Sequence, residues 1–314
     1  MKFFRILFLV MLVTVGYVRA SELKVVQLEH APNGDMLHLQ GNKQLAVSGF
    51  SQFSRSLSLI DLTTFTSKAM PIPDDAQFFQ LATLAGAGSS QVVFLGINGI
   101  SALDQKTNQL HRVLQAESIY RVVDSSRLRS ADFVVDLGSG LSDFIVPDFQ
   151  YTHLYRQQTD GSFRHFALEI PALVQSWRES PEYRPRPHYT VDVNLDGKTD
   201  LLFVHQGKFK VFLQQTDGSF VTTANLSNWP VTLSTEQEAD QRNDAGRSYN
   251  GQYIDSLRDI IDIDGDGVLD LVVNREQLAD ALERNTSFRV HFGLTSAEGL
   301  NFTAEPDTQL TTET

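Results

Sequence analysis

Short apolar runs alternate with polar segments rich in Gly and Asp through most of the chain. Residues 144–146, 201–204 and 271–273 are such runs, and each follows an acidic loop. Runs of this length, bounded by turn residues and rich in Val, Ile and Phe, predict β-strands. No segment keeps an i, i+3, i+4 apolar stripe beyond two or three turns, so long helices are not expected. The pattern predicts an all-β fold.

An internal repeat supports this prediction. The sequence Gln-Gln-Thr-Asp-Gly-Ser-Phe at residues 157–163 recurs at residues 214–220, an offset of 57 residues. The same offset joins Asp143 to Asp200, so that residues 143–163 and 200–220 align without a gap and share eight of 21 residues. A fixed period of this size is the signature of a repeat architecture.

Each unit has the same order of parts. An acidic loop leads into a strand, a turn leads into a second strand, and a Thr-Asp-Gly turn begins a third, where Asp-Gly is a strong hairpin signal. The pattern returns at residues 259–273, where a polar insertion at 275–287 precedes the next strand. Weaker units lie around residues 57–62 and 92–104. We count about five recognisable units, with an incomplete ring or a propeller of up to seven blades as the alternatives.

Units of roughly 50–60 residues with several short strands predict a radial or solenoidal array of small sheets. The polar stretches 177–187 and 232–251 are expected to be loops. No boundary divides the remainder, so residues 21–314 are expected to form one repeat domain.

The N-terminus has the pattern of a signal peptide over residues 1–20. Lys2 and Arg5 precede an apolar run of 13 residues, and Ala20 offers a small residue at a cleavage site. A spanning helix needs roughly 20 residues, although an uncleaved anchor is the alternative. No later segment is apolar enough to span a membrane. We therefore expect an exported protein, periplasmic or extracellular, without a membrane span in the mature chain.

Charge and cysteine content narrow the function classes. The chain has 38 Asp and Glu against 26 Lys and Arg, a net charge of −12, and removal of residues 1–20 makes it more acidic still. An acidic surface repels phosphate backbones, so nucleic acid is not an expected partner. The absence of cysteine excludes thiol catalysis and thiolate metal sites. Together with a signal peptide, it indicates a bacterial exported protein.

Two nine-residue loops, 192–200 and 262–270, carry the candidate chemistry. Both place oxygen-bearing side chains at positions 1, 3, 5 and 9 and Gly at position 6, where the chain must reverse. Ca²⁺ takes six to eight oxygen ligands, and a tightly curled loop points alternate side chains at one centre, with the carbonyl of position 7 facing the ion. The predicted ligands of two Ca²⁺ sites are Asp192, Asn194, Asp196, Lys198 and Asp200, and Asp262, Asp264, Asp266, Val268 and Asp270.

Other interpretations of these loops are a turn that binds nothing and an EF-hand. The EF-hand requires Glu at position 12 and flanking helices, whereas Phe203 or Val273 stands there and strands are expected on both sides. A third loop, 136–143, is one residue shorter and keeps carboxylates only at its ends. We expect it to bind Ca²⁺ weakly or not at all.

The acidic loop, the following apolar strand and the Thr-Asp-Gly-Ser-Phe turn resemble the FG-GAP/VCBS repeat of integrin-α-like propellers and exported bacterial proteins. The resemblance is specific over residues 190–220 and 255–302, fair over 128–165 and faint before 115. It implies a β-propeller with Ca²⁺ held in blade loops by the side chains named above. The chain departs from integrin-type propellers, which have seven blades, and lacks clear Phe-Gly and Gly-Ala-Pro signatures.

Two function classes remain. The first is a non-enzymatic module that binds a protein or glycan, with Ca²⁺ structural. The second is a polysaccharide lyase or hydrolase, whose candidate histidines, at positions 153, 165, 188 and 205, have no recognised catalytic spacing. A pocket of His, Arg and carboxylates away from the loops would favour the enzyme. Exposed aromatics such as Trp177, Tyr183 and Tyr189 would favour binding. The sequence favours the binding module over the enzyme and over a purely structural role.

Overall fold

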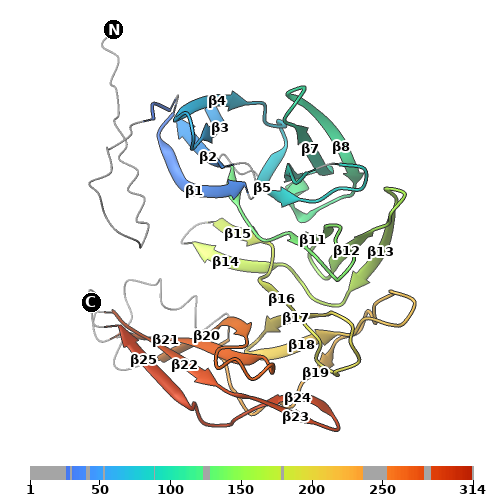
Figure 1. Ribbon diagram of the computed structural model, residues 1–314, viewed down its shortest axis with the longest axis vertical. Helices are drawn as coiled ribbons and strands as arrows, with labels where there is room; N and C mark the ends of the chain where they lie inside the picture. Colours follow the sequence, from blue (N-terminus) through green and yellow to red (C-terminus); the bar gives the residue numbers. More distant parts are fainter. Residues whose placement is uncertain are drawn as a thin grey trace. The chain divides into compact units, whose positions relative to one another are not determined.

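The computed structural model describes residues 26–28, 30–39, 43–51, 54–87, 89–122, 128–177, 180–235, 253–278 and 284–312 (Figure 1). Strands dominate these ranges, and the helical element among them is one 3-10 turn, Ile119–Val122. The part of the chain described contains no helix long and apolar enough to cross a membrane. The predicted signal peptide lies outside the described residues.

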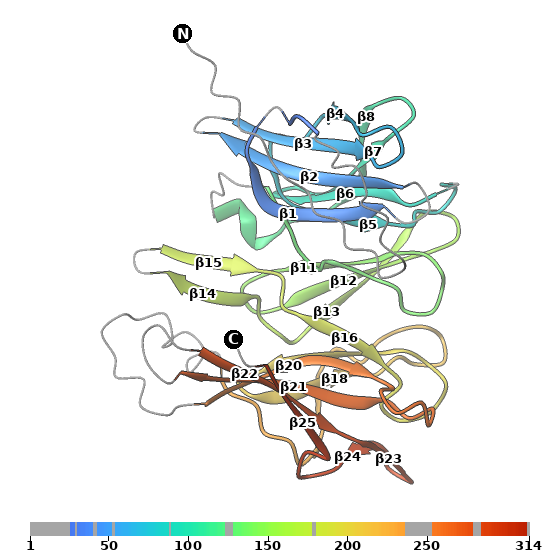
Figure 2. The same ribbon diagram turned by 60° about the vertical axis from the view of Figure 1, so that its left-hand side comes forward.

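The chain divides into two compact units. The first comprises residues 1–134 and 157–163, and the second comprises residues 135–156 and 164–314. Each unit is built mainly from antiparallel sheets in which most neighbouring strands are also consecutive in the sequence (Figures 1 and 2).

The first unit contains two such sheets. The first sheet consists of β1 (Pro32–Leu39), β2 (Gln44–Ser51), β3 (Ser54–Asp61) and β4 (Thr66–Met70). The second consists of β5 (Ala76–Ala82), β6 (Gln91–Gly96), β7 (Gly99–Asp104) and β8 (Gln109–Gln115), with the short β9 (Arg129–Ser130) parallel to β5. One core joins the two sheets, because Leu57 and Met70 of the first pack with Phe79 and Phe94 of the second.

The second unit contains three more four-stranded sheets. The strands of the first are β10 (Val134–Val135), β11 (Asp143–Pro147), β12 (Thr152–Gln157) and β13 (Phe163–Leu168). Those of the next are β16 (His188–Val191), β17 (Asp200–His205), β18 (Lys208–Phe212) and β19 (Asn225–Leu226). The last has β20 (Tyr253–Ile261), β21 (Asp270–Leu278), β22 (Arg284–His291) and β25 (Thr308–Thr312).

Successive sheets with four antiparallel strands are the blades of a β-propeller, and five are present in the described chain, one of them extended by the parallel β9. The predicted fold class and the count of five units are therefore confirmed. The 57-residue repeat aligns β11 with β17, so that Asp143 and Asp200 each open the same strand of their blade. Asp270 opens the corresponding strand β21.

Strand β17 is apolar on both faces because both faces are covered. Along β17, Leu201 and Phe203 belong to a core shared with Ile145 of the preceding blade. Leu202, which points to the opposite face as successive strand residues do, packs in a second core with Leu271 of the following blade. Burial of each such side chain contributes roughly 1.5–3 kcal/mol. The continuous apolar run is thus explained by neighbours on both sides.

Two segments differ from the sequence prediction. The stretch 177–187 was expected to be a loop, but β15 (Ser180–Arg184) within it pairs with β14 (Leu173–Trp177) as a hairpin. The insertion 275–287 lengthens the β21–β22 hairpin, whose pairing extends to Leu278 and Arg284. In both cases cross-strand pairing overrides a polar composition. A further hairpin joins β23 (Gly293–Ser296) and β24 (Gly299–Phe302), and most of the predicted loop 232–251 lies outside the described residues.

Candidate metal centre

The two predicted calcium loops occupy the same place in their blades. Residues 192–200 connect β16 to β17, and residues 262–270 connect β20 to β21. The shorter loop 136–143 connects β10 to β11 in the same way. Strands flank all three loops, which confirms that none is an EF-hand.

The first aspartate of each loop turns its carboxylate towards the loop backbone. Asp192 accepts hydrogen bonds from the N–H groups of Asp196 (3.0 Å) and Gly197 (2.7 Å). Asp262 accepts from Gly265 (2.7 Å) and Gly267 (3.0 Å). The carboxylate at position 1 therefore holds the curl of the loop in both blades.

The last aspartate of each loop is buried and ties the loop to the blade. The Asp200 carboxylate is 0% exposed and accepts from the N–H groups of Val193 (3.0 Å) and Gln214 (2.8 Å). The Asp270 carboxylate, 1% exposed, accepts from Ile263 (2.8 Å) and Gly293 (2.9 Å). Asp200 and Asp270 thus accept hydrogen bonds from equivalent backbone positions in the two blades, and we call this arrangement the loop frame. Each carboxylate oxygen keeps a second lone pair, so this role does not prevent it from binding a cation.

The backbone reversal uses two left-handed residues in each loop. Gly197 (φ 83°) and Gly267 (φ 87°) at position 6 meet the sequence prediction. Position 4 is also left-handed, as Leu195 (φ 58°) in one loop and Gly265 (φ 81°) in the other. A side chain in this region costs roughly 1–2 kcal/mol. Position 4 was not predicted, because it carries no oxygen ligand and its residue type differs between the two loops.

The second loop gathers more negative charge than the first. Carboxylate oxygens of Asp262, Asp264 and Asp270 lie within 4.8 Å of one another, a spacing that suits a metal ion. In the first loop, position 3 is the amide Asn194, and Asp196 forms an ion pair of 2.7 Å with Lys198. Lys198 was predicted to contribute its carbonyl, but its ammonium group also competes for one predicted ligand.

Two carboxylates of the first loop have pKa values that are shifted in opposite directions. Burial raises the pKa of Asp200, and the charges of Asp192 and Asp196 add to this, while the N–H bonds from Gln214 and Val193 oppose it. The hydrogen bond from Lys198 lowers the pKa of Asp196. A cation among these carboxylates would relieve their mutual repulsion.

An arginine supplies positive charge beside the shortened loop 136–143. The Arg156 Nε lies 3.9 Å from the buried Asp143 carboxylate, and its Nη2 donates to the carbonyl of Leu137 (3.2 Å). Asp136 keeps the turn by accepting from Gly138 (2.9 Å) and Gly140 (3.3 Å). The turn is preserved without the middle carboxylates, which gives a physical reason for the prediction that this loop binds Ca²⁺ weakly or not at all.

Two of the four candidate histidines meet on the blade β10–β13. The Nε2 of His165 lies 3.0 Å from the Nδ1 of His153, and the His165 ring stacks on Tyr155 with centroids 4.7 Å apart. Asp148 lies 3.7 Å from the other nitrogen of His153. His188 instead lies beside Phe203, with ring centroids 6.1 Å apart. The pairing could not be foreseen because it depends on strand register.

Of the three aromatic residues whose exposure would favour binding, Tyr183 and Tyr189 are described and both are half-buried. The Tyr189 hydroxyl donates to the carbonyl of Leu257 (2.9 Å), so this ring is fixed within its surroundings. Tyr183 makes an edge contact with Phe149 at 5.9 Å. The Trp177 side chain lies outside the described residues. Exposed aromatics in the described chain are Phe149 (47%), Tyr151 (41%) and Tyr253 (50%), for which the sequence pattern gave no signal.

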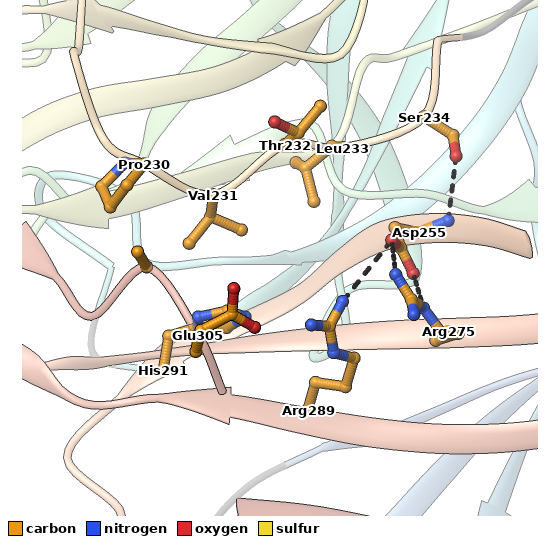
Figure 3. A pocket seen from close by; sticks show the side chains of 11 residues that line it. Pro230, Val231, Thr232, Leu233, Ser234, Asp255, Arg275, Arg289, His291 and Glu305 are labelled. Atoms are coloured by element: carbon orange, nitrogen blue, oxygen red, sulfur yellow. Dashed lines mark hydrogen bonds and ion pairs between the residues drawn. The ribbon is translucent and has the colours of Figure 1, made fainter. Parts of the chain in front are cut away.

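A polar pocket of about 340 Å³ lies on the last blade (Figure 3). Strands β20, β21 and β22 supply Asp255, Arg275, Arg289 and His291, and residues 230–234 form the opposite wall. The Asp255 carboxylate receives two hydrogen bonds from Arg275, from Nε at 2.7 Å and from Nη2 at 2.5 Å. This site could not be predicted from the sequence, because its members come from three strands and Arg275 lies in a stretch of polar composition.

No protein-family model matches the sequence, and no curated protein matches it either. Similar solved structures include an Agrocybe aegerita lectin that recognises non-reducing terminal N-acetylglucosamine, at 13% identity and a TM-score of 0.37, covering 89% of this chain and 80% of that one. A quinoprotein alcohol dehydrogenase-like protein from Bacteroides thetaiotaomicron has 12% identity and a TM-score of 0.38, covering 91% and 70%. The V. cholerae biofilm matrix protein Bap1 has 11% identity and a TM-score of 0.34, covering 92% of this chain and 51% of that one.

Proposed function

We propose that this protein is an exported, calcium-binding β-propeller of the FG-GAP/VCBS type that acts as a binding module for a protein or glycan. Two Ca²⁺ ions would be held in loops 192–200 and 262–270 and would have a structural role. The observation that carries the proposal is the repeated frame, in which equivalent carboxylates accept equivalent backbone hydrogen bonds in two blades.

The residues present fit a hard divalent cation. Aspartate and amide oxygens are the ligands that Ca²⁺ prefers, and the loops offer neither thiolate nor imidazole. The second loop has four carboxylates, whereas the first has three and the Lys198 ammonium. We therefore expect loop 262–270 to bind Ca²⁺ more tightly than loop 192–200.

When bound, Ca²⁺ would supply positive charge that offsets the clustered carboxylates and stiffens both loops. Binding to the native state alone stabilises it by RT ln(1 + [L]/Kd). Extracellular modules bind Ca²⁺ with dissociation constants of about 10⁻⁴–10⁻³ M, so millimolar Ca²⁺ would fill the sites in large part. The signal-peptide pattern of residues 1–20 supports export to such a compartment.

The enzyme hypothesis has one observation in its favour, the pocket that brings His291, Arg289 and Asp255 together away from the loops. General acid-base catalysis needs a group free to exchange a proton with the substrate. Asp255 is instead held by two hydrogen bonds from Arg275. This arrangement suits ligand binding better than proton transfer, so we rank the lyase or hydrolase second.

Calcium titration of chelator-treated protein tests the proposal. We expect calorimetry to show two sites and the melting temperature to rise with Ca²⁺. Asp196→Ala and Asp266→Ala should each remove one site, and Asp217→Ala, in an exposed turn outside both loops, serves as the matched control. If no heat is released and the melting temperature does not move, the loops are turns only and the proposal fails.

A further inference from the structure

The sheet face beneath the pocket changes from apolar to charged along its strands. On β21, Leu271 and Val273 belong to the core, and Arg275 is the next residue on the same face. On β22, Arg289 pairs with Val273 and His291 with Leu271, which places both on that face as well. Charged side chains on a face that elsewhere packs into a core need an explanation, because burying a charge is costly unless it is paired.

The opposite wall of the pocket is fixed to the sheet. The Ser234 N–H donates to the carbonyl of Asp255, and the Asp255 N–H donates to the Ser234 hydroxyl, both at 2.9 Å. Val231 and Leu233 of the same wall are buried in the core. These contacts fix the wall formed by residues 230–234 against the sheet (Figure 3).

Two guanidinium groups share one carboxylate at the base of the pocket. Arg275 donates hydrogen bonds to both carboxylate oxygens of Asp255. Its guanidinium carbon also lies over the Tyr253 ring, 4.7 Å from the ring centroid. Arg289 approaches the same carboxylate only to 3.7 Å, beyond hydrogen-bond distance. Its side chain is 17% exposed, and within the described residues it has no other ion pair. Arg289 thus presents hydrogen-bond donors and a positive charge that Asp255 does not hold by a hydrogen bond.

His291 and Glu305 add hydrogen-bond acceptors. The His291 side chain is 2% exposed, its Nδ1 lies 2.9 Å from the carbonyl of Thr303, and its Nε2 has no partner in the described part of the chain. A carbonyl accepts only from a protonated Nδ1, so in the neutral ring Nε2 is an acceptor. Burial lowers the pKa of His291, which favours that neutral ring. The exposed Glu305 carboxylate lines the same pocket.

We propose that this pocket binds a hydroxylated carboxylate, such as a uronic acid unit of an acidic glycan, with Arg289 on the carboxylate and His291 and Glu305 as acceptors for hydroxyl groups. Guanidinium and carboxylate match in geometry and charge. Neither acceptor has a hydrogen to offer an anion, so the ligand must bring donors of its own, and a sugar acid does. The inference rests on the binding role proposed above and names its ligand class.

Calorimetric titration with D-glucuronate is the direct test, with D-glucose and N-acetylglutamate as matched probes. D-glucose lacks the carboxylate, and N-acetylglutamate lacks the hydroxyl groups. We expect glucuronate to bind and both comparison probes to bind at least tenfold more weakly. Equal binding of glucose, or tighter binding of N-acetylglutamate, would overturn the assignment.

Arg289→Met separates ligand binding from a structural role. The variant keeps the Asp255–Arg275 pair, so its melting temperature should not fall. Glucuronate should bind about ten- to hundredfold more weakly, because one charge-assisted contact is lost. Arg258→Met, on the exposed face of the same blade, should change neither. A fall in melting temperature with unchanged glucuronate affinity would make Arg289 a structural counter-ion to Asp255 and would refute the proposal.

The calcium proposal and the pocket proposal fail separately. Glucuronate titrations are made with Ca²⁺ and with chelator, and Arg289→Met should keep the full Ca²⁺ response. Loss of Ca²⁺ binding with intact glucuronate binding would count against the loops alone, and the reverse result would count against the pocket alone.

Discussion

The backbone N–H of Gln214 donates a 2.8 Å hydrogen bond to the buried carboxylate of Asp200. Because Asp200 also accepts from Val193 (3.0 Å), it joins the start of the acidic loop to the segment that follows β18. Asp270 makes the same connection in the next blade, to Ile263 and Gly293. The ninth residue of each loop is therefore part of the blade framework as well as a predicted Ca²⁺ ligand.

Asp200→Ala should destabilise the protein even without calcium. The change leaves the N–H groups of Val193 and Gln214 without their acceptor, and an unsatisfied buried group costs about 1–3 kcal/mol. We expect a loss of about 2–4 kcal/mol in the free energy of unfolding, measured with denaturant in the presence of chelator. Asp217→Ala, at an exposed turn, is the control, and an equal effect of both changes would contradict this framework role.

Lys198→Met should strengthen calcium binding by the first loop. It removes the ammonium that lies 2.7 Å from Asp196 and competes with a cation for that carboxylate. Exposed ion pairs of this type are weak, so we expect an affinity gain of about two- to fivefold. Calorimetric titration of the variant should show the change in one of two sites, and an unchanged first site would contradict competition by Lys198 for that carboxylate.

Arg156→Met should destabilise the blade that carries the shortened loop. The guanidinium lies 3.9 Å from the buried Asp143 and donates to the carbonyl of Leu137. Loss of hydrogen bonds from a charged donor costs about 1.5–3 kcal/mol. Thermal unfolding measures the effect. Asp143→Asn combined with Arg156→Met should cost less than the sum of the two single changes if the residues interact, and strict additivity would argue against the pair.

Acidification should destabilise the protein through His165. Burial lowers the pKa of this histidine, and the neighbouring His153 lowers it further. The unfolded chain therefore binds a proton more readily than the folded one, so stability is greatest above the ordinary histidine pKa of about 6.5 and declines as the pH falls towards the folded pKa. Unfolding free energies between pH 8 and 5 should show this slope.

His165→Gln should flatten that slope in part. A residual slope is expected from His291, whose pKa burial also lowers. His205→Gln is a suitable control, because this residue lies at the end of β17, outside the His153–His165 pair. If His165→Gln leaves the pH dependence of stability unchanged, His165 is not the group that titrates.

The sequence was informative where structure is local or repeated. The apolar runs, the Asp-Gly turns and the 57-residue repeat predicted the strands and blades, because these depend on neighbours along the chain. Gly197 could be assigned to the loop reversal, but the left-handed Leu195 could not, since its residue type gives no signal. The pairing of His165 with His153 and of Arg275 with Asp255 depends on which strands adjoin and in what register. Such relationships emerge only from tertiary structure.

Leu202 and Phe203 are consecutive residues that pack into two different cores. If the sheet β16–β19 opened, the apolar faces of both neighbouring sheets in the second unit would become exposed to water. Opening of one sheet would therefore destabilise the next. Unfolding of this unit should then be a single cooperative transition, and a protein shortened by one internal repeat should aggregate rather than survive as a smaller version of itself.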